Sequence, residues 1–179
     1  MKLTTYWFKK WKPCRKGVEW FLENFDYGAN TKKVIKKIIK DNELDYANWA
    51  LVRCMTYEQY VKYACYAAKQ VLHIYEKKYP DDKRPRDAIN AALKCAKKPT
   101  KKNMTSAAFY ADAARVASYT DAAAARAADS AFFASFAAAS ASAASASASF
   151  TSFAATRAAS FATRALRIKI LNFGLREMK

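Results

Sequence analysis

The stretch from Thr100 to Phe173 contains neither glycine nor proline and is dominated by alanine and serine. Alanine has the highest helix propensity, whereas glycine and proline are the strongest helix breakers. Seventy-four residues without a breaker therefore predict long helices, with breaks expected near Thr120-Asp121 and at Ser149–Ser152. Because their side chains are small, neighbouring helices can approach closely, and we expect them to pack backbone against backbone.

The rest of the chain also indicates helices. Three glycines in 179 residues leave few positions for tight β-turns, and apolar residues recur at helical spacing between a few joints. The sequence therefore predicts an all-α bundle of about seven or eight helices with close-packed Ala/Ser-rich helices in its C-terminal half. We expect a basic N-terminal module over residues 1–54 and a second helical domain over 55–179, which can also form one continuous domain.

Local signals mark where several helices begin. Thr31 suits an N-cap, and Thr56-Tyr-Glu-Gln59 fits a capping box, in which two side chains satisfy the first free N–H groups of a helix. Pro85 suits a first helical turn, where its missing N–H is not needed. The three helices are expected over 32–40, from the capping box to about Lys78, and from Arg86 to about Lys97.

The formal net charge is +17 and sits mainly in the N-terminal half, where residues 1–104 carry +13. Such a charge attracts polyanions or small anionic ligands and speeds their association. Solubility alone is the other interpretation. The densest basic groups are Lys9, Lys10, Lys12, Arg15 and Lys16, and Lys32, Lys33, Lys36, Lys37 and Lys40.

The chain offers no metal or catalytic motif. Its cysteines have no CxxC spacing and it has one histidine, His73, so we expect no metal, no cofactor and four reduced cysteines in the core of a cytoplasmic protein. His73 is expected to be an ordinary helix residue. We therefore predict a binding protein, not an enzyme. The cysteines are Cys14, Cys54, Cys65 and Cys95.

Two segments bear on targeting. Residues 1–12 are aromatic and basic, and we expect an arm or strap rather than a signal peptide because lysines interrupt any apolar run. Residues 130–156 carry no charge, which is long enough for a membrane span. They are rich in serine and poor in large aliphatic residues, so we expect a buried helix pair and no membrane role.

A family resemblance is carried by Tyr63-Ala-Cys-Tyr-Ala-Ala, Val71-Leu-His-Ile-Tyr-Glu and Tyr79-Pro-Asp-Asp-Lys-Arg-Pro-Arg. These segments resemble the helix–turn–helix signature of a family of bacterial and phage immunity proteins, in which an Ala-rich helical tail follows. Upstream, Cys14-Arg-Lys-Gly-Val-Glu-Trp-Phe and Asp45-Tyr-Ala-Asn-Trp are similar to an N-terminal module of phage-like proteins. The resemblance covers about two thirds of the chain and implies a setting in phage–bacterium conflict, without catalytic residues.

Arg84 and Arg86 flank Pro85 at an expected helix start. A helix N-terminus favours anions, and two guanidinium groups there could clamp a phosphate or carboxylate. The alternative is that both arginines pair with the neighbouring acids and fix the turn. Those acids are Asp81, Asp82 and Asp87.

The next candidate is a series of tyrosines that recur every three residues, Tyr57, Tyr60, Tyr63 and Tyr66, of which the last two are the expected ligand-binding residues. Such rings could stack on a base, or they could pack in the core or at an interface. Arg157 and Arg164 have no acidic neighbour along their helices. A cation among alanines needs water, a carboxylate or a ligand, so both are candidates for lining an anionic site.

Together these patterns predict a non-catalytic protein of phage–bacterium conflict that sequesters an anionic, nucleotide-like ligand. Arg84, Arg86, Tyr63, Tyr66, Arg157 and Arg164 are its expected ligand-binding residues. One alternative is an immunity protein that masks a toxin by protein–protein binding, and another is a weak, non-specific nucleic-acid binder. Because Ala/Ser faces need a partner at close range, we also expect a homo-oligomer.

Overall fold

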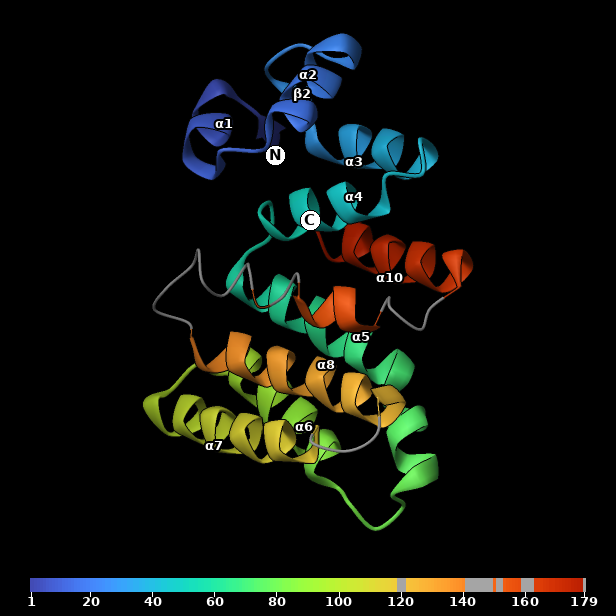
Figure 1. Ribbon diagram of the computed structural model, residues 1–179. Helices are drawn as coiled ribbons and strands as arrows, with labels where there is room; N and C mark the ends of the chain where they lie inside the picture. The colour runs from blue at the N-terminus through green and yellow to red at the C-terminus, as the bar shows by residue number, and fades with distance from the viewer. Residues whose placement is uncertain (119–121, 141–149, 151–152, 159–162, 179) are drawn as a thin grey trace.

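The computed structural model describes residues 1–118, 122–140, 150, 153–158 and 163–178. It confirms an all-α bundle, with one two-stranded antiparallel ribbon at the N-terminal end (Figure 1). The helices are α1 (Thr5–Trp11), α2 (Arg15–Asn24), α3 (Thr31–Lys40), α4 (Leu44–Val52), α5 (Tyr57–Lys78), α6 (Arg84–Lys97), α7 (Lys101–Ala117), α8 (Ala122–Ala139) and α10 (Arg164–Glu177), and the strands are β1 (Lys2–Leu3) and β2 (Ala29–Asn30).

Most helix boundaries follow the local signals. The capping box at Thr56 and Gln59 is present and opens α5. Pro85 lies in the first turn of α6, while α3 is capped one residue earlier than expected, by the side chain of Asn30. Residues 1–12 are more ordered than an arm, because Thr4 caps the short helix α1. The breaks expected at Thr120-Asp121 and Ser149–Ser152 fall largely outside the described residues.

Helix α5 runs through the middle of the protein and is buried on two adjacent faces, while its remaining face is exposed. One side, which includes Tyr63, Val71 and Tyr75, joins a hydrophobic cluster with α3, α4 and α10. The other, which includes Val61 and Leu72, joins a second cluster with α6, α7 and α8. Helix α5 is therefore the wall that the two cores share.

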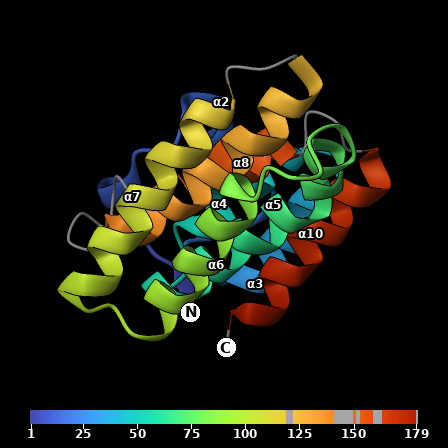
Figure 2. The same ribbon diagram turned by 90° about the horizontal axis from the view of Figure 1, so that it is seen from below.

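The second cluster is built mainly from alanine. Helices α6 and α8 pack against α5, and α7 packs against α6 and α8 (Figure 2). Alanines such as Ala107 and Ala134 are fully buried among these helices. The buried hydroxyl of Ser135 donates to the carbonyl oxygen of Ala107 at 2.7 Å, and that of Ser130 donates to Ala154 at 2.8 Å. Such bonds reach the neighbouring backbone only where helices approach closely, so the close packing of this half is confirmed.

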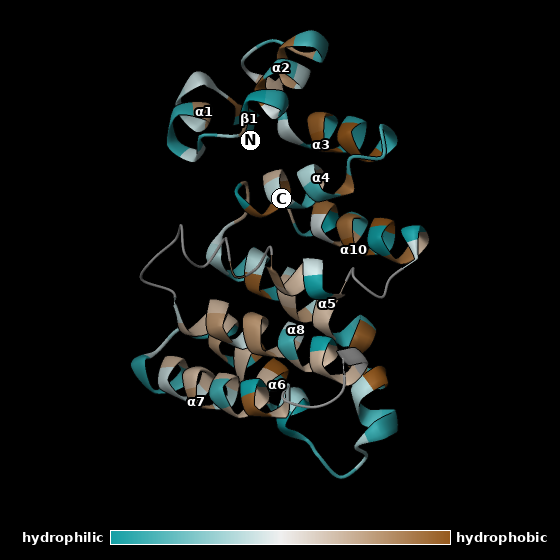
Figure 3. Cartoon of the chain, in the orientation of Figure 1, coloured by the Kyte–Doolittle hydropathy of each residue, from teal (hydrophilic) through white to brown (hydrophobic). Residues whose placement is uncertain are grey.

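The first cluster contains the larger apolar side chains. Strong hydrophobic colouring marks α3, α4 and α10, whereas α7 and α8 are pale (Figure 3). Helix α10 packs against both α4 and α5, so the end of the chain joins the predicted N-terminal module to the rest. The boundary between 54 and 55 remains a prediction, and the hydrophobic cluster around α5 extends across it.

Gly174 lets α10 approach α4 and α5. A Cβ atom at this position would lie 2.5 Å from Cδ2 of Leu51 and 2.9 Å from the ring of Tyr63. At Gly17, in α2, a Cβ atom would meet nothing closer than the Cys14 sulfur at 3.6 Å. The two glycines therefore form a matched pair, one required by packing and one not.

We expect Gly174→Ala to destabilise the protein by about 1–3 kcal/mol, because an extra methyl group in a packed core forces its neighbours to move. Gly17→Ala should leave stability unchanged or raise it slightly, since alanine favours the helix. Urea unfolding followed by circular dichroism measures both changes. Equal stability of the two variants would contradict this packing of α10.

Candidate ligand-binding site

The structure places Arg84 and Arg86 beside carboxylates. The guanidinium group of Arg84 donates to Asp82 at 2.6–3.0 Å, and these bonds hold the pKa of Asp82 well below its usual range. Arg86 makes a two-pronged ion pair with Glu76 on α5. The arrangement thus matches the alternative in which both arginines fix the turn, although the acid paired with Arg86 comes from the preceding helix.

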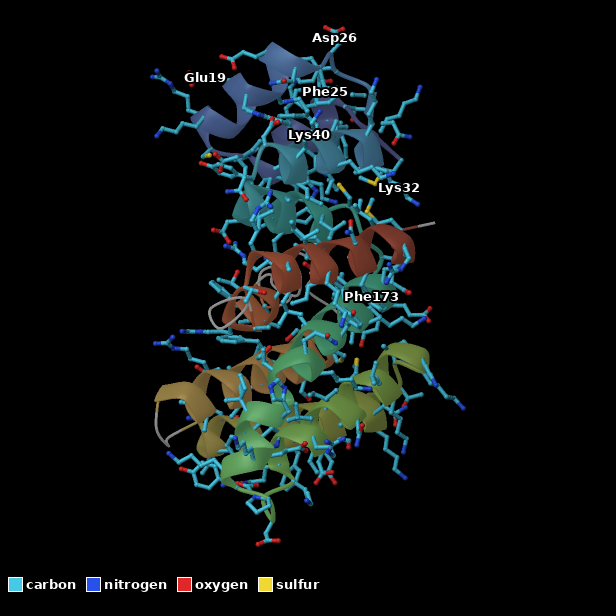
Figure 4. All side chains as sticks on the ribbon, turned by 90° about the vertical axis from the view of Figure 1, so that its right-hand side faces the viewer. Glu19, Phe25, Asp26, Lys32, Lys40 and Phe173 are labelled. Carbon is cyan, nitrogen blue, oxygen red and sulfur yellow. The ribbon has the colours of Figure 1, made fainter. Side chains whose placement is uncertain are left out.

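The two tyrosines serve packing. Tyr63 is fully buried, and its hydroxyl donates to Oδ1 of Asn48 at 2.9 Å. The ring of Tyr66 stacks on Phe173 of α10, with centroids 3.9 Å apart and ring planes 3° from parallel; Figure 4 marks Phe173 on that helix. One face of Tyr66 is therefore covered, and Tyr63 is not accessible to a ligand.

The remaining two arginines lie in separate neighbourhoods. Nε of Arg157 is 3.9 Å from a carboxylate oxygen of Asp129, and Nε of Arg164 donates to Oδ1 of Asn42 at 2.7 Å. The predicted residues are thus distributed over the α6 start, the core, the α8 region and the α10 start. The structure does not gather them into one pocket.

The four cysteines and the single histidine differ in their burial. Cys54, Cys65 and Cys95 are buried, as expected, whereas Cys14 is exposed. The difference arises because Cys14 is the N-cap of α2 and precedes its apolar face. His73 is exposed on α5. Within the described residues, no group of three metal-binding side chains comes together.

A different group of residues forms a cationic cavity of about 520 Å³. The cavity lies where the N-terminal residues and α1 meet the joint between α4 and α5, and no aspartate or glutamate is among the residues that line it. We call it the Arg53 cavity. Its aromatic and basic lining residues are Lys2, Tyr6, Trp7, Lys10, Trp11, Arg53, Tyr57 and Tyr60.

Arg53 follows the last residue of α4 and is half-buried. Its guanidinium carbon lies 4.0 Å from the ring centroid of Trp49 and 5.6 Å from that of Trp11. One terminal nitrogen donates to the carbonyl oxygen of Trp49 at 2.9 Å, while the buried Nε has no hydrogen-bond partner. Among the described residues, no carboxylate pairs with this cation.

Burial lowers the pKa of Arg53 to about 10. The group therefore stays charged at neutral pH, and the folded state carries a cost of desolvating that charge, which the hydrogen bond to Trp49 and the two indole rings offset only in part. Because the folded pKa is below the ordinary value, this cost is relieved only as the pH rises above about 10. An anion bound next to Arg53 would remove the same cost at neutral pH.

Other groups of the Arg53 cavity add positive charge and aromatic surface to it. The ammonium group of Lys10 lies 5.1 Å from the ring centroid of Trp11, so this indole has cations near it from two residues. Tyr6 is 71% exposed and therefore accessible at the mouth. The N-terminus of the 22-residue helix α5 also borders the cavity, and its dipole favours negative charge there.

Arg53 carries the same sequence signal that marks Arg157 and Arg164 as candidates for an anionic site. No acidic residue lies within four positions of Arg53 in the sequence, which is the same signal. It was missed because Arg53 lies at a helix joint rather than within an alanine-rich helix. The approach of α1 to this joint is a tertiary contact that no local pattern shows.

A family model, the YdhT N-terminal domain, matches residues 1–59. The match covers a third of the chain and includes nearly all of the Arg53 cavity. Searches of curated proteins and of solved structures gave no match. No helix within the described ranges is both long and apolar enough to cross a bilayer.

We expect Arg53→Met to unfold at the same temperature as the wild type or higher. Methionine fills a similar volume without a buried charge, and each kcal/mol of relieved cost raises the Tm of a protein of this size by about 2–4 °C. Differential scanning calorimetry at pH 7 measures the change. A fall of several degrees would mean that Arg53 is a structural cation rather than an uncompensated one.

Proposed function

We propose that this protein is a non-catalytic binding protein that sequesters a small, anionic, nucleotide-like ligand in the Arg53 cavity. The observation that carries the proposal is a half-buried guanidinium group that no carboxylate of the described residues pairs with, in a cavity whose lining contains no acid. Hydrogen bonds from a charged donor to an anion are stronger than those between neutral groups. The guanidinium group of Arg53 is therefore the principal anchor for a phosphate or carboxylate, through its terminal nitrogens, because the unpaired Nε is itself buried.

The rest of the cavity supports a ligand that also carries a planar ring. A volume of about 520 Å³ lies within the usual range for small-molecule sites, about 300–1,000 Å³. Aromatic side chains such as Tyr6 and Trp11 offer faces on which a base can stack, and Lys2 and Lys10 add positive charge. The lining of the Arg53 cavity thus supports binding of an anionic ligand with a planar ring, as expected from the sequence, but with residues other than the expected Arg84 and Arg86.

The test is isothermal titration calorimetry with a panel of linear and cyclic nucleotides, on the wild type, Arg53→Met and Arg84→Ala. Loss of a hydrogen bond to a charged group costs about 1.5–3 kcal/mol of affinity, so Arg53→Met should weaken binding by at least tenfold. Arg84→Ala should bind as the wild type does, because Arg84 is paired with Asp82 outside the cavity.

Two results would overturn the proposal. One is no heat of binding for any member of the panel with the wild type. The other is unchanged affinity in Arg53→Met, which would place the anion elsewhere. Calorimetric unfolding of each variant shows that both are folded before the titrations are compared.

Nucleic-acid binding is a second candidate, favoured by helix α3. Lys33, Lys36 and Lys40 are exposed along one side of it, and Lys32 is half-exposed; Figure 4 marks Lys32 and Lys40. Lys37 is different, because it pairs with Asp41 at 2.6 Å. If these lysines contact four phosphates of a duplex, log K should fall with log salt with a slope of about −3.6.

We expect such binding to be weak and independent of sequence. Fluorescence anisotropy with a labelled duplex at several salt concentrations measures it, and Lys33→Gln with Lys36→Gln should reduce the slope by about 2. Tight, sequence-selective binding at physiological salt would make nucleic acid the principal ligand. Masking of a toxin, homo-oligomerisation and a setting in phage–bacterium conflict remain predictions from the sequence.

A further inference from the structure

A second cavity, of about 800 Å³, lies on another side of α1, among α1, α2, α3 and α4. We call it the aromatic cavity. It shares Trp7 with the Arg53 cavity but otherwise has its own lining. Its lining includes the aromatic side chains of Trp7, Phe8, Trp20, Phe21 and Trp49. The indole of Trp20 is held in place by a 3.1 Å hydrogen bond from Nε1 to Asp41.

Gly17 keeps this cavity open. The other two glycines have structural reasons: Gly28 has a positive φ of 96°, and Gly174 has no room for a Cβ atom. Gly17 has neither, since its φ is not positive and a Cβ atom there would make only ordinary contacts. A glycine lowers helix stability relative to alanine, yet this one lies within α2 and lines the cavity. The absence of a side chain leaves space that a ligand can fill.

The rim of the aromatic cavity is charged. Lys12 and Lys16 line it, and neither has a carboxylate partner among the described residues. Glu43 and Asp45 line it as well, but Asp45 forms an ion pair with Arg167. Two uncompensated cations therefore face one uncompensated carboxylate, so the rim favours an anion over a cation.

We propose that the aromatic cavity binds a small, largely apolar molecule that carries one anionic group, such as an aromatic or medium-chain acid. The apolar body replaces water against the indole and phenyl rings, which is favourable in proportion to the area covered. The anionic group remains at the rim beside Lys12 and Lys16. This site is independent of the ligand proposed for the Arg53 cavity.

The test uses two fluorescent probes with the same rings, 8-anilinonaphthalene-1-sulfonate and its uncharged analogue N-phenyl-1-naphthylamine. We expect the sulfonate to bind the wild type and Gly17→Ala alike, and to bind Gly17→Leu at least tenfold more weakly because leucine fills the cavity. Gly17→Leu should unfold at or above the wild-type temperature, which shows that the fold is kept. Decanoate should displace the bound sulfonate.

Two further variants separate the parts of the proposal. Lys12→Gln with Lys16→Gln should weaken the sulfonate severalfold and leave the uncharged probe unchanged. Arg53→Met should bind both probes as the wild type does. The proposal for the aromatic cavity is therefore tested independently of the proposal for the Arg53 cavity. Equal sulfonate affinity in folded Gly17→Leu would overturn the cavity as the site, and no effect of the lysine changes would overturn the anionic class of ligand.

Discussion

The burial of helix α5 on two adjacent faces, each in a different hydrophobic cluster, is the constraint on which the rest of the structure depends. One face belongs to the hydrophobic cluster of α3, α4 and α10 and the other to that of α6, α7 and α8, so neither core is complete without this helix. Alanines at Ala64, Ala67 and Ala68 let neighbours approach it closely. Since the start of α5 is fixed by the capping box at Thr56, the joint that carries Arg53 is fixed too.

Both candidate sites follow from this anchoring of the N-terminal residues. Helix α1 is short and lies over the α4–α5 joint through Trp7, whose ring meets Trp49 edge to face at 5.8 Å. Large rings cannot fill the space on either side of such a helix as completely as alanines fill the space around α8. The result is two cavities that share an indole wall, one of them basic and one apolar.

The fold was predictable from the sequence wherever local chemistry decides it. Breaker positions, the Thr56 capping box and the alanine-rich composition predict the helices, and the expected close packing is confirmed by Ser135 bonding to Ala107. The site was not predictable in the same way. Arg157 looked isolated along the chain but lies near Asp129, and Arg86 pairs with Glu76 of the preceding helix rather than with an adjacent acid, because tertiary packing decides which acids face which bases. Arg53 combines sequence isolation with a cavity whose lining contains no carboxylate.

The central claim is that an anion completes the environment of Arg53. It is tested most directly by nitrogen-15 correlation spectra of the arginine Nε–Hε groups, titrated with inorganic phosphate and then with a nucleotide. The account predicts that the Arg53 signal, assigned by its loss in Arg53→Met, shifts on titration and that its hydrogen exchange slows, while the signals of Arg84 and Arg86 stay in place. An Arg53 signal that does not respond while those of other arginines shift would contradict it.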